Sequence, residues 1–285
     1  MKIVIVGSGG QLGNEFQKFL KGQENVYAFS RQELDVTDAE EVFATLHSIE
    51  PDVVVNCAAY TRVDQAEREK DLCHRINVLG ARNVAWAAYR IRAKVVYFST
   101  DYVFDGEHAI PYTELDEPCP LSVYGWSKLW GEYFTRSCNP NHLVVRTSWL
   151  YGEMGHNFVK TVVRLAREKG KLKVVDDQHG VPTWTKDLVQ QTFELLVRDR
   201  VGLYHCASLG QTSWFHVSQI IIQVLGLSAE VFPISTEEYG ALARRPKYSV
   251  LSNYFLELEG LNHMRFWEEA LREFLTLFRK EFLRE

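Results

Sequence analysis

The sequence predicts an α/β protein with a doubly wound, Rossmann-type parallel sheet and a smaller, interleaved C-terminal domain. Short β-branched runs alternate with segments of helical spacing over the first 150 residues, and a glycine-rich turn joins the first run to the first helical segment. Such alternation is typical of a parallel sheet that is covered by helices on both faces. The rhythm then loosens, with Pro182, Gly202, Gly210 and Pro233 as breaks, which indicates a second and smaller unit.

The expected elements follow one another along the chain. The expected strands are 2–6, 26–29, 53–55, 95–98 and 143–146. The expected helices are 11–20, 39–49, 72–89 and a helix that includes Tyr124. The strands are apolar on both faces, as a sheet buried between two layers of helices requires.

These elements suggest how the chain is divided. Residues 1–150 form the predicted dinucleotide-binding domain, to which the chain returns near 176–200. Residues 151–175 and 201–285 are assigned mainly to the substrate domain, interleaved with the first domain because no linker separates them. The apolar spacing over 265–285 predicts an amphipathic helix that packs on the core, with a subunit contact as the alternative.

The composition argues against several classes of protein. The 285 residues carry a net charge of −5 and a sequence pI near 6.0, without a basic block, so neither a nucleic acid nor an anionic membrane is an expected partner. The five cysteines are an odd number without C-x-x-C spacing, which argues against a disulfide framework and a structural zinc site. No apolar stretch is long enough for a signal peptide or a membrane span, and we expect a cytoplasmic protein.

A glycine-rich turn follows the first expected strand. Gly7, Gly10 and Gly13 fit the pattern G-x-x-G-x-x-G between a strand and a helix, the context in which this pattern indicates a dinucleotide site. Glycines let the backbone approach a pyrophosphate, and the free N–H groups at a helix start favour its charge. Together with Gln11 and Leu12, they form the first part of the predicted cofactor site.

The end of the second strand indicates which dinucleotide is preferred. Sites for NAD usually place an acid there to bind the ribose 2′-hydroxyl. This chain has Ser30 and Arg31 instead, a hydroxyl and a guanidinium that suit a 2′-phosphate, so NADPH is the predicted cofactor and NADH a weaker one. Asp35 and Val36 are predicted contacts of the adenine edge. The alternative is that Arg31 is a solvated surface charge.

Small residues follow the third strand. Cys57, Ala58, Ala59 and Tyr60 lie where a cofactor would need the backbone to come close, although tight packing of a helix on a strand requires small residues too. Asn77 lies inside an expected helix, where asparagine is unfavourable without a specific partner. We predict that Asn77 belongs to the cofactor site and ties the catalytic strand to this helix.

The residues that carry the chemistry come from two later segments. Thr100 closes an apolar run, and Tyr124 and Lys128 lie four residues apart on an expected helix, so they share a face. A cation beside a phenol lowers the pKa of the tyrosine, which makes Tyr124 a proton donor to a carbonyl that receives a hydride. The Thr100 hydroxyl would hold that carbonyl. Tyr-x-x-x-Lys is common on amphipathic helices, but the order of the parts favours a hydride-transfer site.

The chain resembles the extended short-chain dehydrogenase/reductases and, within them, the dTDP-4-dehydrorhamnose reductases. The resemblance spans nearly the whole chain. The motifs that carry it are GSGGQLG at 7–13, NCAAYTRVDQAE at 56–67, STDYVFDG at 99–106, YGWSKLWGE at 124–132, RTSWLYG at 146–152, NFV at 157–159, DQHGVPT at 177–183 and RRPKYSVL at 244–251. The first and fourth are shared across the superfamily, while STDYVFDG, RTSWLYG and DQHGVPT are narrower.

The resemblance implies NADPH-dependent reduction of the 4-keto group of dTDP-4-dehydro-L-rhamnose to dTDP-L-rhamnose. It implies that Thr100, Tyr124 and Lys128 are catalytic, with Tyr124 as proton donor and Lys128 on the nicotinamide ribose. The implied substrate contacts are Asp101, Val103, Trp149, Asn157 and Arg245. Trp149 could equally be part of the core, since aromatic side chains are usually buried. The motifs do not distinguish dTDP from UDP or GDP.

Related activities stay open at this point. Sugar-nucleotide dehydratases need a carboxylic acid where this chain has Tyr102, which argues against dehydration. Sugar-nucleotide 4-epimerases share the tyrosine and lysine but retain NAD. A related branch is the non-catalytic, NADP-binding regulatory subunit of methionine adenosyltransferase, although the intact catalytic residues favour an enzyme.

Metal binding and assembly are less defined. Some members of the family are dimers with magnesium bound by glutamates, and Glu15 occupies a compatible position, which leaves a homodimer open for this chain. Its partner carboxylates cannot be matched, and a lone acid in the first turn of a helix usually interacts with the helix dipole. No metal site is therefore predicted.

Overall fold

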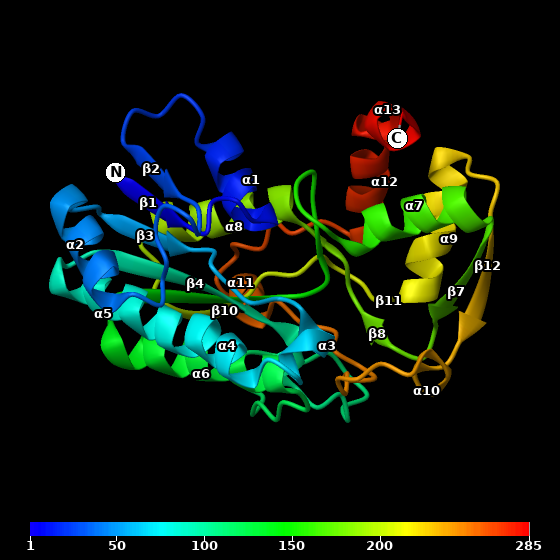
Figure 1. Cartoon of the computed structure of the whole chain (residues 1–285), viewed down its shortest axis with the longest axis horizontal. Helices are drawn as coiled ribbons and strands as arrows, with labels where there is room; N and C mark the ends of the chain where they lie inside the picture. Colours follow the sequence, from blue (N-terminus) through cyan, green and yellow to red (C-terminus); the bar gives the residue numbers. More distant parts are fainter. Residues whose placement is uncertain (285) are drawn as a thin grey trace.

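The computed structural model describes residues 1–284, and its centre is a six-stranded parallel sheet (Figure 1). The strands lie in the order β10, β5, β4, β3, β1, β2. Their bounds are β1 Ile3–Val6, β2 Val26–Phe29, β3 Val53–Asn56, β4 Lys94–Thr100, β5 His142–Thr147 and β10 Gly202–His205. The predicted fold class is confirmed. Because β1 pairs with both β2 and β3, the strand order reverses there, and the carboxyl ends of β1 and β3 open a crevice.

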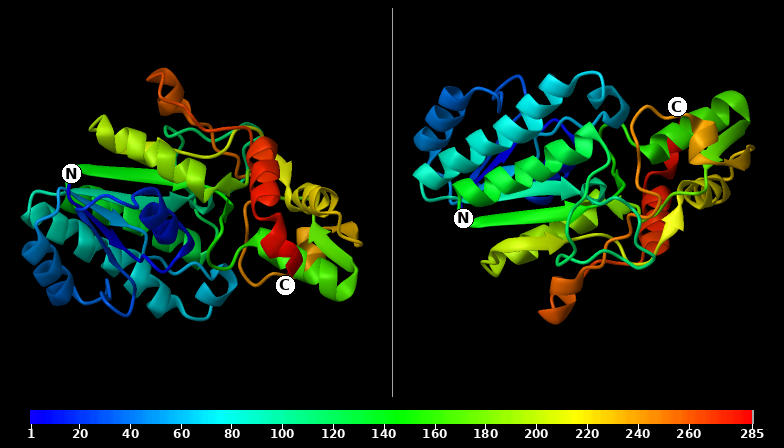
Figure 2. Two further views of the ribbon diagram at one scale, coloured as in Figure 1. Left: turned by 90° about the horizontal axis from the view of Figure 1, so that it is seen from above. Right: turned by 90° about the horizontal axis from the view of Figure 1, so that it is seen from below.

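Helices cover both faces of this sheet (Figures 1 and 2). One face carries α2 (Ala39–Ile49), α5 (Ala81–Arg90) and α6 (Val123–Cys138), and the other carries α1 (Gln11–Phe19) and α8 (Thr185–Val197). Fully buried valine and isoleucine side chains of β1, β3 and β4 supply the two cores between the sheet and its helices. The β-branched runs form strands because both of their faces are covered.

The helix expected at 72–89 is a composite. The chain forms α3 (Val63–Ala66) and α4 (Lys70–His74), then a π-helical stretch at Arg75–Gly80 that continues into α5. Gly80 lies against Val36, where a side chain would collide. The wider π turn contains Asn77, and such turns are frequent at functional sites.

The smaller unit lies at the carboxyl ends of the strands (Figure 1). Its helices are α7 (Phe158–Lys169), α9 (Trp214–Leu225), α10 (Thr236–Tyr239) and α12 (Trp267–Leu277), followed by α13 (Arg279–Arg284). Its paired strands are β7 (Lys171–Val175) with β12 (Glu230–Ile234), β8 (His179–Gly180) with β11 (Thr212–Ser213), and β6 (Leu150–Tyr151) with β9 (Thr183–Trp184). A separate hydrophobic core joins these elements.

The chain crosses between the two units more than once. Helix α8 lies within the stretch 176–200, where we expected the chain to return to the dinucleotide-binding domain, and it packs on α1. Strand β10 begins at Gly202 and pairs with β5, and α11 (Tyr254–Leu258) packs beside it, so parts of 201–285 also belong to the larger sheet. The sequence signal was weak because β10 contains no β-branched residue.

The expected C-terminal helix is present in two pieces. Helix α12 ends at Leu277, and α13 begins at Arg279. Trp267, Phe274 and Leu275 are buried in the core of the smaller unit, as the apolar spacing predicted. Among the described residues, no helix is long and apolar enough to cross a membrane.

Candidate active site

The glycine turn after β1 is built for close backbone approach. Gly7 adopts φ +77°, and a side-chain carbon there would lie 2.6 Å from the backbone nitrogen of Ala58. The backbone N–H groups of Gly7 and Ser8 both donate to the carbonyl of Phe29. Only glycine combines this conformation with this contact. The turn therefore brings the ends of β1, β2 and β3 together at one place.

A cavity of about 310 Å³ opens above this turn. It brings together most of the predicted cofactor residues, namely Gly7, Gly10, Ser30, Arg31, Asp35, Val36, Cys57, Ala58 and Ala59. Helix α1 begins beside it, and its N-cap Gly10 has no side chain to cap the first N–H groups. An unfilled helix start favours an anion, so these residues fit the pyrophosphate and adenosine half of a dinucleotide.

Side chains at the end of β2 set the charge of this cavity. Arg31 is exposed and forms no ion pair within residues 1–284. The carboxylate of Glu33, which our sequence analysis did not single out, accepts a hydrogen bond of 2.8 Å from the Ser30 backbone. The Asp35 carboxylate accepts from the backbone and the hydroxyl of Thr37, at 2.9 Å each. Arg31 is therefore available to an anionic ligand while both acids are engaged locally.

The remaining predicted cofactor residues lie around the cavity. Gln11 accepts a hydrogen bond of 3.0 Å from Asn157, Leu12 is part of the core, and Gly13 packs on the carbonyl of Gly7. Tyr60 and Asn77 are buried behind the loop that follows β3. These residues shape the turn and its supporting layer.

Asn77 joins two segments that border the site. Its side chain accepts a 2.7 Å hydrogen bond from the Tyr60 backbone N–H and donates to Ser127 at 2.9 Å. Ser127 in turn donates to the carbonyl of Tyr124 at 2.7 Å. We predicted a tie to the catalytic strand, but Asn77 ties the loop after β3 to α6. The difference arises because the π turn directs this side chain toward α6 rather than toward β4.

Strand β4 and helix α6 bring the predicted catalytic residues together. Thr100 ends β4, and Tyr124 lies in the first turn of α6, whose N-cap Ser122 accepts a hydrogen bond of 3.1 Å from Gly125. Gly125 packs directly on the backbone carbonyl of Tyr102, so α6 begins against the turn that follows Thr100. A hydrogen bond joins the Thr100 hydroxyl and the Tyr124 phenol.

Burial dominates the electrostatics of Tyr124 and Lys128. Lys128 is 3% exposed, and its ammonium lies 4.1 Å from the ring centroid of Tyr97. Burial lowers the pKa of Lys128 to about 7, although Glu132 favours the charged form. Burial also raises the pKa of Tyr124 well above its ordinary value. The sequence analysis predicted that Lys128 lowers the pKa of Tyr124, whereas in the protein alone the pKa is raised and desolvation is the largest cause.

The predicted substrate residues have different environments. Asp101 is 2% exposed and accepts hydrogen bonds from Thr100 at 2.9 Å and from Ser249 at 2.5 Å. Val103 is fully buried in the core of the smaller unit, so its side chain faces away from the cleft. Asn157 caps α7 and donates to the carbonyl of Gly152 at 2.9 Å.

Trp149 occupies a strained position beside the cleft. Its backbone has φ +46°, which is uncommon for a residue with a bulky side chain. Its ring stacks on Trp214 with 3.6 Å between centroids, and Trp214 lines the cleft. Trp149 therefore supports an aromatic wall of this cleft.

A cleft of about 1120 Å³ lies between the two units. Tyr102, Arg62 and Arg245 line it from the larger unit side, and α7, β7 and Trp214 line it from the smaller unit. Arg245 forms a two-pronged ion pair with Asp64, at 3.0 and 2.7 Å. Further cations on the rim are Lys169, Lys171 and Lys173. The cleft can hold an elongated anionic molecule whose end reaches the turn after Thr100.

Several cleft residues were not identified from the sequence. Phe158 and Gln178 lie inside motifs that we quoted, NFV and DQHGVPT, so a signal for them was present. Arg62 likewise lies inside the quoted motif at 56–67, whereas Trp214 and Tyr239 have no comparable signal, because they meet the cleft only through the crossings of the chain.

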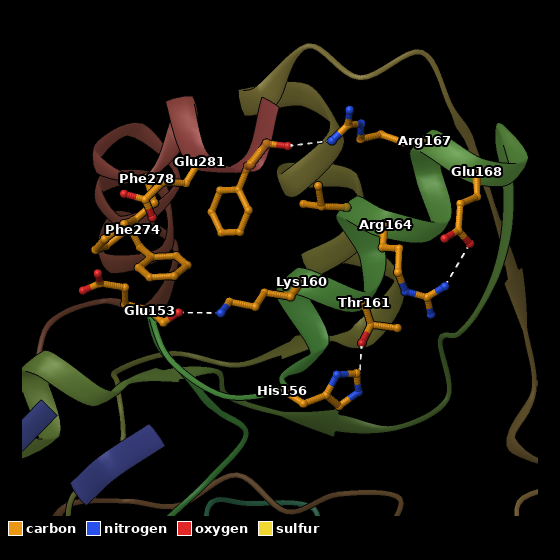
Figure 3. Close-up of a pocket in the computed structure, with 12 residues that line it drawn as sticks. Glu153, His156, Lys160, Thr161, Arg164, Arg167, Glu168, Phe274, Phe278 and Glu281 are labelled. Carbon is orange, nitrogen blue, oxygen red and sulfur yellow. Dashed lines mark hydrogen bonds and ion pairs between the residues drawn. The ribbon is translucent and has the colours of Figure 1, made fainter. Parts of the chain in front are cut away.

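A second hollow, of about 450 Å³, lies between α7 and the C-terminal helices (Figure 3). Phe274, Phe278 and Phe282 line its apolar side, and Lys160 and Arg164 lie on α7. Lys160 bonds to the carbonyl of Glu153 and Arg164 to Glu168, as the dashed lines show. None of the predicted cofactor, catalytic or substrate residues lines this hollow, so we do not assign the reaction to it.

The comparisons with known proteins agree with this geometry. The family model described as RmlD substrate binding domain matches residues 1–280. The chain belongs to this family. Spore coat polysaccharide biosynthesis protein SpsK of Bacillus subtilis is 42% identical over 96% of both chains.

Two solved structures are similar to this chain over nearly its full length. The dTDP-4-dehydrorhamnose reductase of Clostridium acetobutylicum has a TM-score of 0.96 and 45% identity, over 98% of this chain and 100% of that one. The dTDP-4-dehydrorhamnose reductase of Bacillus anthracis, solved in complex with NADP, has a TM-score of 0.94 and 43% identity, over 97% and 99%. The resemblance to these reductases is confirmed, and with it the class of oxidoreductase.

Among residues 1–284, no three His, Cys, Asp or Glu side chains gather in a way that could hold a metal ion. Glu15 is buried and accepts a hydrogen bond of 3.1 Å from Thr185, and burial raises its pKa. The Glu15 carboxylate therefore contacts the first residue of α8.

Proposed function

We propose that this chain reduces the 4-keto group of dTDP-4-dehydro-L-rhamnose to dTDP-L-rhamnose, with NADPH as cofactor. The observation that carries the proposal is that the catalytic residues adjoin both cavities. The ring of Tyr124 packs edge-on against Tyr102, which lines the cationic cleft, and Lys128 interacts electrostatically with Cys57, which lines the glycine-turn cavity. The names of the similar reductases support the substrate, and the NADP in one of them supports the cofactor.

The residues present fit a dinucleotide. Gly7 leaves a space that a side chain would fill, Gly10 leaves the start of α1 uncapped, and Arg31 offers an unpaired cation on the rim. The nicotinamide supplies the hydride when it is bound. These residues would hold its pyrophosphate and the 2′-phosphate.

Each catalytic residue has a role in the reduction. Tyr124 donates its phenolic proton to the O4 atom of the sugar as that oxygen gains negative charge, so a C4–H bond and an O4–H bond form while the carbonyl π bond breaks. Thr100 orients the phenol through their hydrogen bond. Lys128 in its charged form stabilises the phenolate that remains. Arg245 and the rim lysines would bind the diphosphate.

The direct test mixes the purified chain with NADPH and dTDP-4-dehydrorhamnose. We expect loss of the NADPH absorbance and formation of dTDP-L-rhamnose, identified by NMR and mass spectrometry. The UDP and GDP analogues, and other dTDP-4-keto-6-deoxy sugars, serve as comparison substrates. Tight NADPH binding without turnover of any of them would instead favour a regulatory, non-catalytic role. Size-exclusion chromatography of the same sample tests for the homodimer.

Arg31 provides a test of cofactor preference. Substituting Arg31→Ala should raise the KM for NADPH by about tenfold, because a charged hydrogen bond to the 2′-phosphate is lost, and leave the KM for NADH nearly unchanged. Gln32→Ala, beside it in the same cavity, is the matched control. Equal changes for both cofactors would mean that Arg31 does not read the 2′-phosphate.

The pKa of Lys128 leads to a prediction of how activity depends on pH. Its pKa of about 7 means that the ammonium loses its proton as pH rises through that value. If the charged form is needed, kcat/KM should fall on the alkaline side of about pH 7. The profile is measured at saturating sugar nucleotide and low NADPH, with Lys128→Met as reference. A flat profile up to the ordinary pKa range of lysine would contradict this role.

A further inference from the structure

The segment 243–251 links the two units of the molecule. On one side Tyr112 forms a β-bridge with Leu251, and Pro246 packs against Gly106. On the other side His179 donates to the carbonyl of Lys247 at 2.7 Å and accepts from the Ser249 N–H at 2.8 Å. The backbone of this linking segment is therefore held from both sides. This also fixes the backbone position from which the Ser249 side chain extends.

Ser249 reaches the catalytic strand through one buried carboxylate. Its hydroxyl donates to Oδ2 of Asp101 at 2.5 Å, and the hydroxyl of Thr100 donates to Oδ1 at 2.9 Å. Ser249 and Asp101 are each 2% exposed, so water has little access to compete for these bonds. The three side chains form one continuous chain of hydrogen bonds from the linking segment to the catalytic site.

This series of hydrogen bonds determines where the Thr100 hydroxyl can donate its proton. A hydroxyl has a single proton to donate, and that of Thr100 points to Asp101. The Thr100 oxygen accepts from the Tyr102 N–H at 3.2 Å and also faces the phenol of Tyr124. If Asp101 turned or lost its charge, the Thr100 proton would be free to point elsewhere, and the bond to Tyr124 would change direction.

We propose that Ser249 is a positioning residue for the reduction, which holds the Asp101 carboxylate and, through it, keeps the Thr100 hydroxyl in place beside the phenol of Tyr124. Asp101 then acts through Thr100 rather than on the sugar. The proposal rests on the proposed function, because it concerns the same proton transfer. It assigns a role to the serine of the RRPKYSVL motif, 148 residues away from Asp101 in the sequence.

The electrostatics of Asp101 are consistent with this role. Burial raises the pKa of Asp101 to about 7, and the hydrogen bonds from Ser249 and Thr100 oppose the rise. The groups that face Asp101 are the phenols of Tyr102 and Tyr124, whose pKa values its charge raises, with Arg245 beyond Tyr102. Loss of the Ser249 donor should therefore move the carboxyl further toward its protonated form near neutral pH.

The kinetic test compares three serine variants. Ser249→Ala should lower kcat by about tenfold, the worth of one charge-assisted hydrogen bond, with little change in the KM for NADPH. Ser249→Thr keeps the hydroxyl and should restore most of the rate. Ser252→Ala is the matched control, because Ser252 lies just beyond the linking segment, is half-buried, and its hydroxyl bonds to no described residue. An equal loss in Ser252→Ala would overturn the proposal.

A double-mutant cycle tests whether Ser249 and Asp101 act together. In an Asp101→Asn background, Ser249→Ala should lower kcat by much less than it does in the native protein. Additive losses would mean that Ser249 acts independently of Asp101 and would overturn the proposal. Melting temperatures of all variants separate these effects from a loss of folding.

An infrared titration decides the proposal without any substrate. The carboxyl stretching band that disappears in Asp101→Asn should titrate near pH 7 in the native protein. The midpoint should rise in Ser249→Ala and stay in place in Ser252→Ala. An unchanged midpoint in Ser249→Ala overturns the inference. Absence of turnover in the native protein would refute the proposed function, while the titration still decides the role of Ser249.

Discussion

Substitution of Tyr124→Phe is expected to lower kcat by about 10²–10⁴ while NADPH still binds. The change removes one oxygen atom and its proton from a half-buried ring, so the packing of α6 against Tyr102 is retained. The hydrogen bond between Thr100 and the phenol is lost, together with the proton that O4 requires. Single-turnover kinetics and fluorescence titration with NADPH separate chemistry from binding.

Tyr133→Phe is the control for this experiment. Tyr133 lies on the same helix but is 55% exposed, and the same atom is removed there far from the cleft. It should behave as the native protein. If Tyr124→Phe kept most of the native rate, another group would have to deliver the proton. If it lost NADPH binding as well, the phenol would have a role in holding the cofactor.

The larger unit was predictable because its signals are local. Each buried strand is a short β-branched run, and Gly7 marks the turn at which the first strand ends. The carboxyl ends of parallel strands meet at one edge, so the residues after β1, β2 and β3 had to approach one another. This is why the cavity at the glycine turn contains Ser30 and Ala58, as expected.

Residues that depend on burial were harder to predict. Spacing alone placed Lys128 on the same face as Tyr124, but it could not show that the ammonium is 3% exposed beside Tyr97. The direction of a pKa shift depends on the balance between desolvation and neighbouring charges, and only the folded packing sets that balance. Val103 shows the same difficulty, since it follows the catalytic motif and yet faces the core.

The cleft could not be predicted from local patterns. The ion pair that fixes Arg245 joins it to Asp64, 181 residues earlier in the chain. The aromatic wall needs Trp149 and Trp214 to stack across another long separation. Both contacts follow from the way the chain crosses between the units, a global property that neither hydrophobic periodicity nor residue spacing records.

A buried ion pair holds α6 on the sheet and should dominate the stability of the site. Arg146 of β5 donates to both carboxylate oxygens of Glu132 at 2.9 and 2.8 Å, and the two side chains are 3% and 2% exposed. Glu132 lies one helical turn after Lys128. Substituting Glu132→Gln should lower the free energy of unfolding by about 3–5 kcal/mol, because the Arg146 charge stays buried without its partner.

The double variant Glu132→Gln/Arg146→Met separates this cost from a loss of packing. It removes both charges, so most of the stability should return, whereas turnover should stay low if the pair also positions Lys128. Neighbouring His205 does not replace the missing charge, because burial and Arg146 lower its pKa to about 3 and keep it neutral. Urea unfolding of the native, single and double variants measures the effect. Equal losses in the single and double variants would show that the contact, rather than an unpaired charge, accounts for the change.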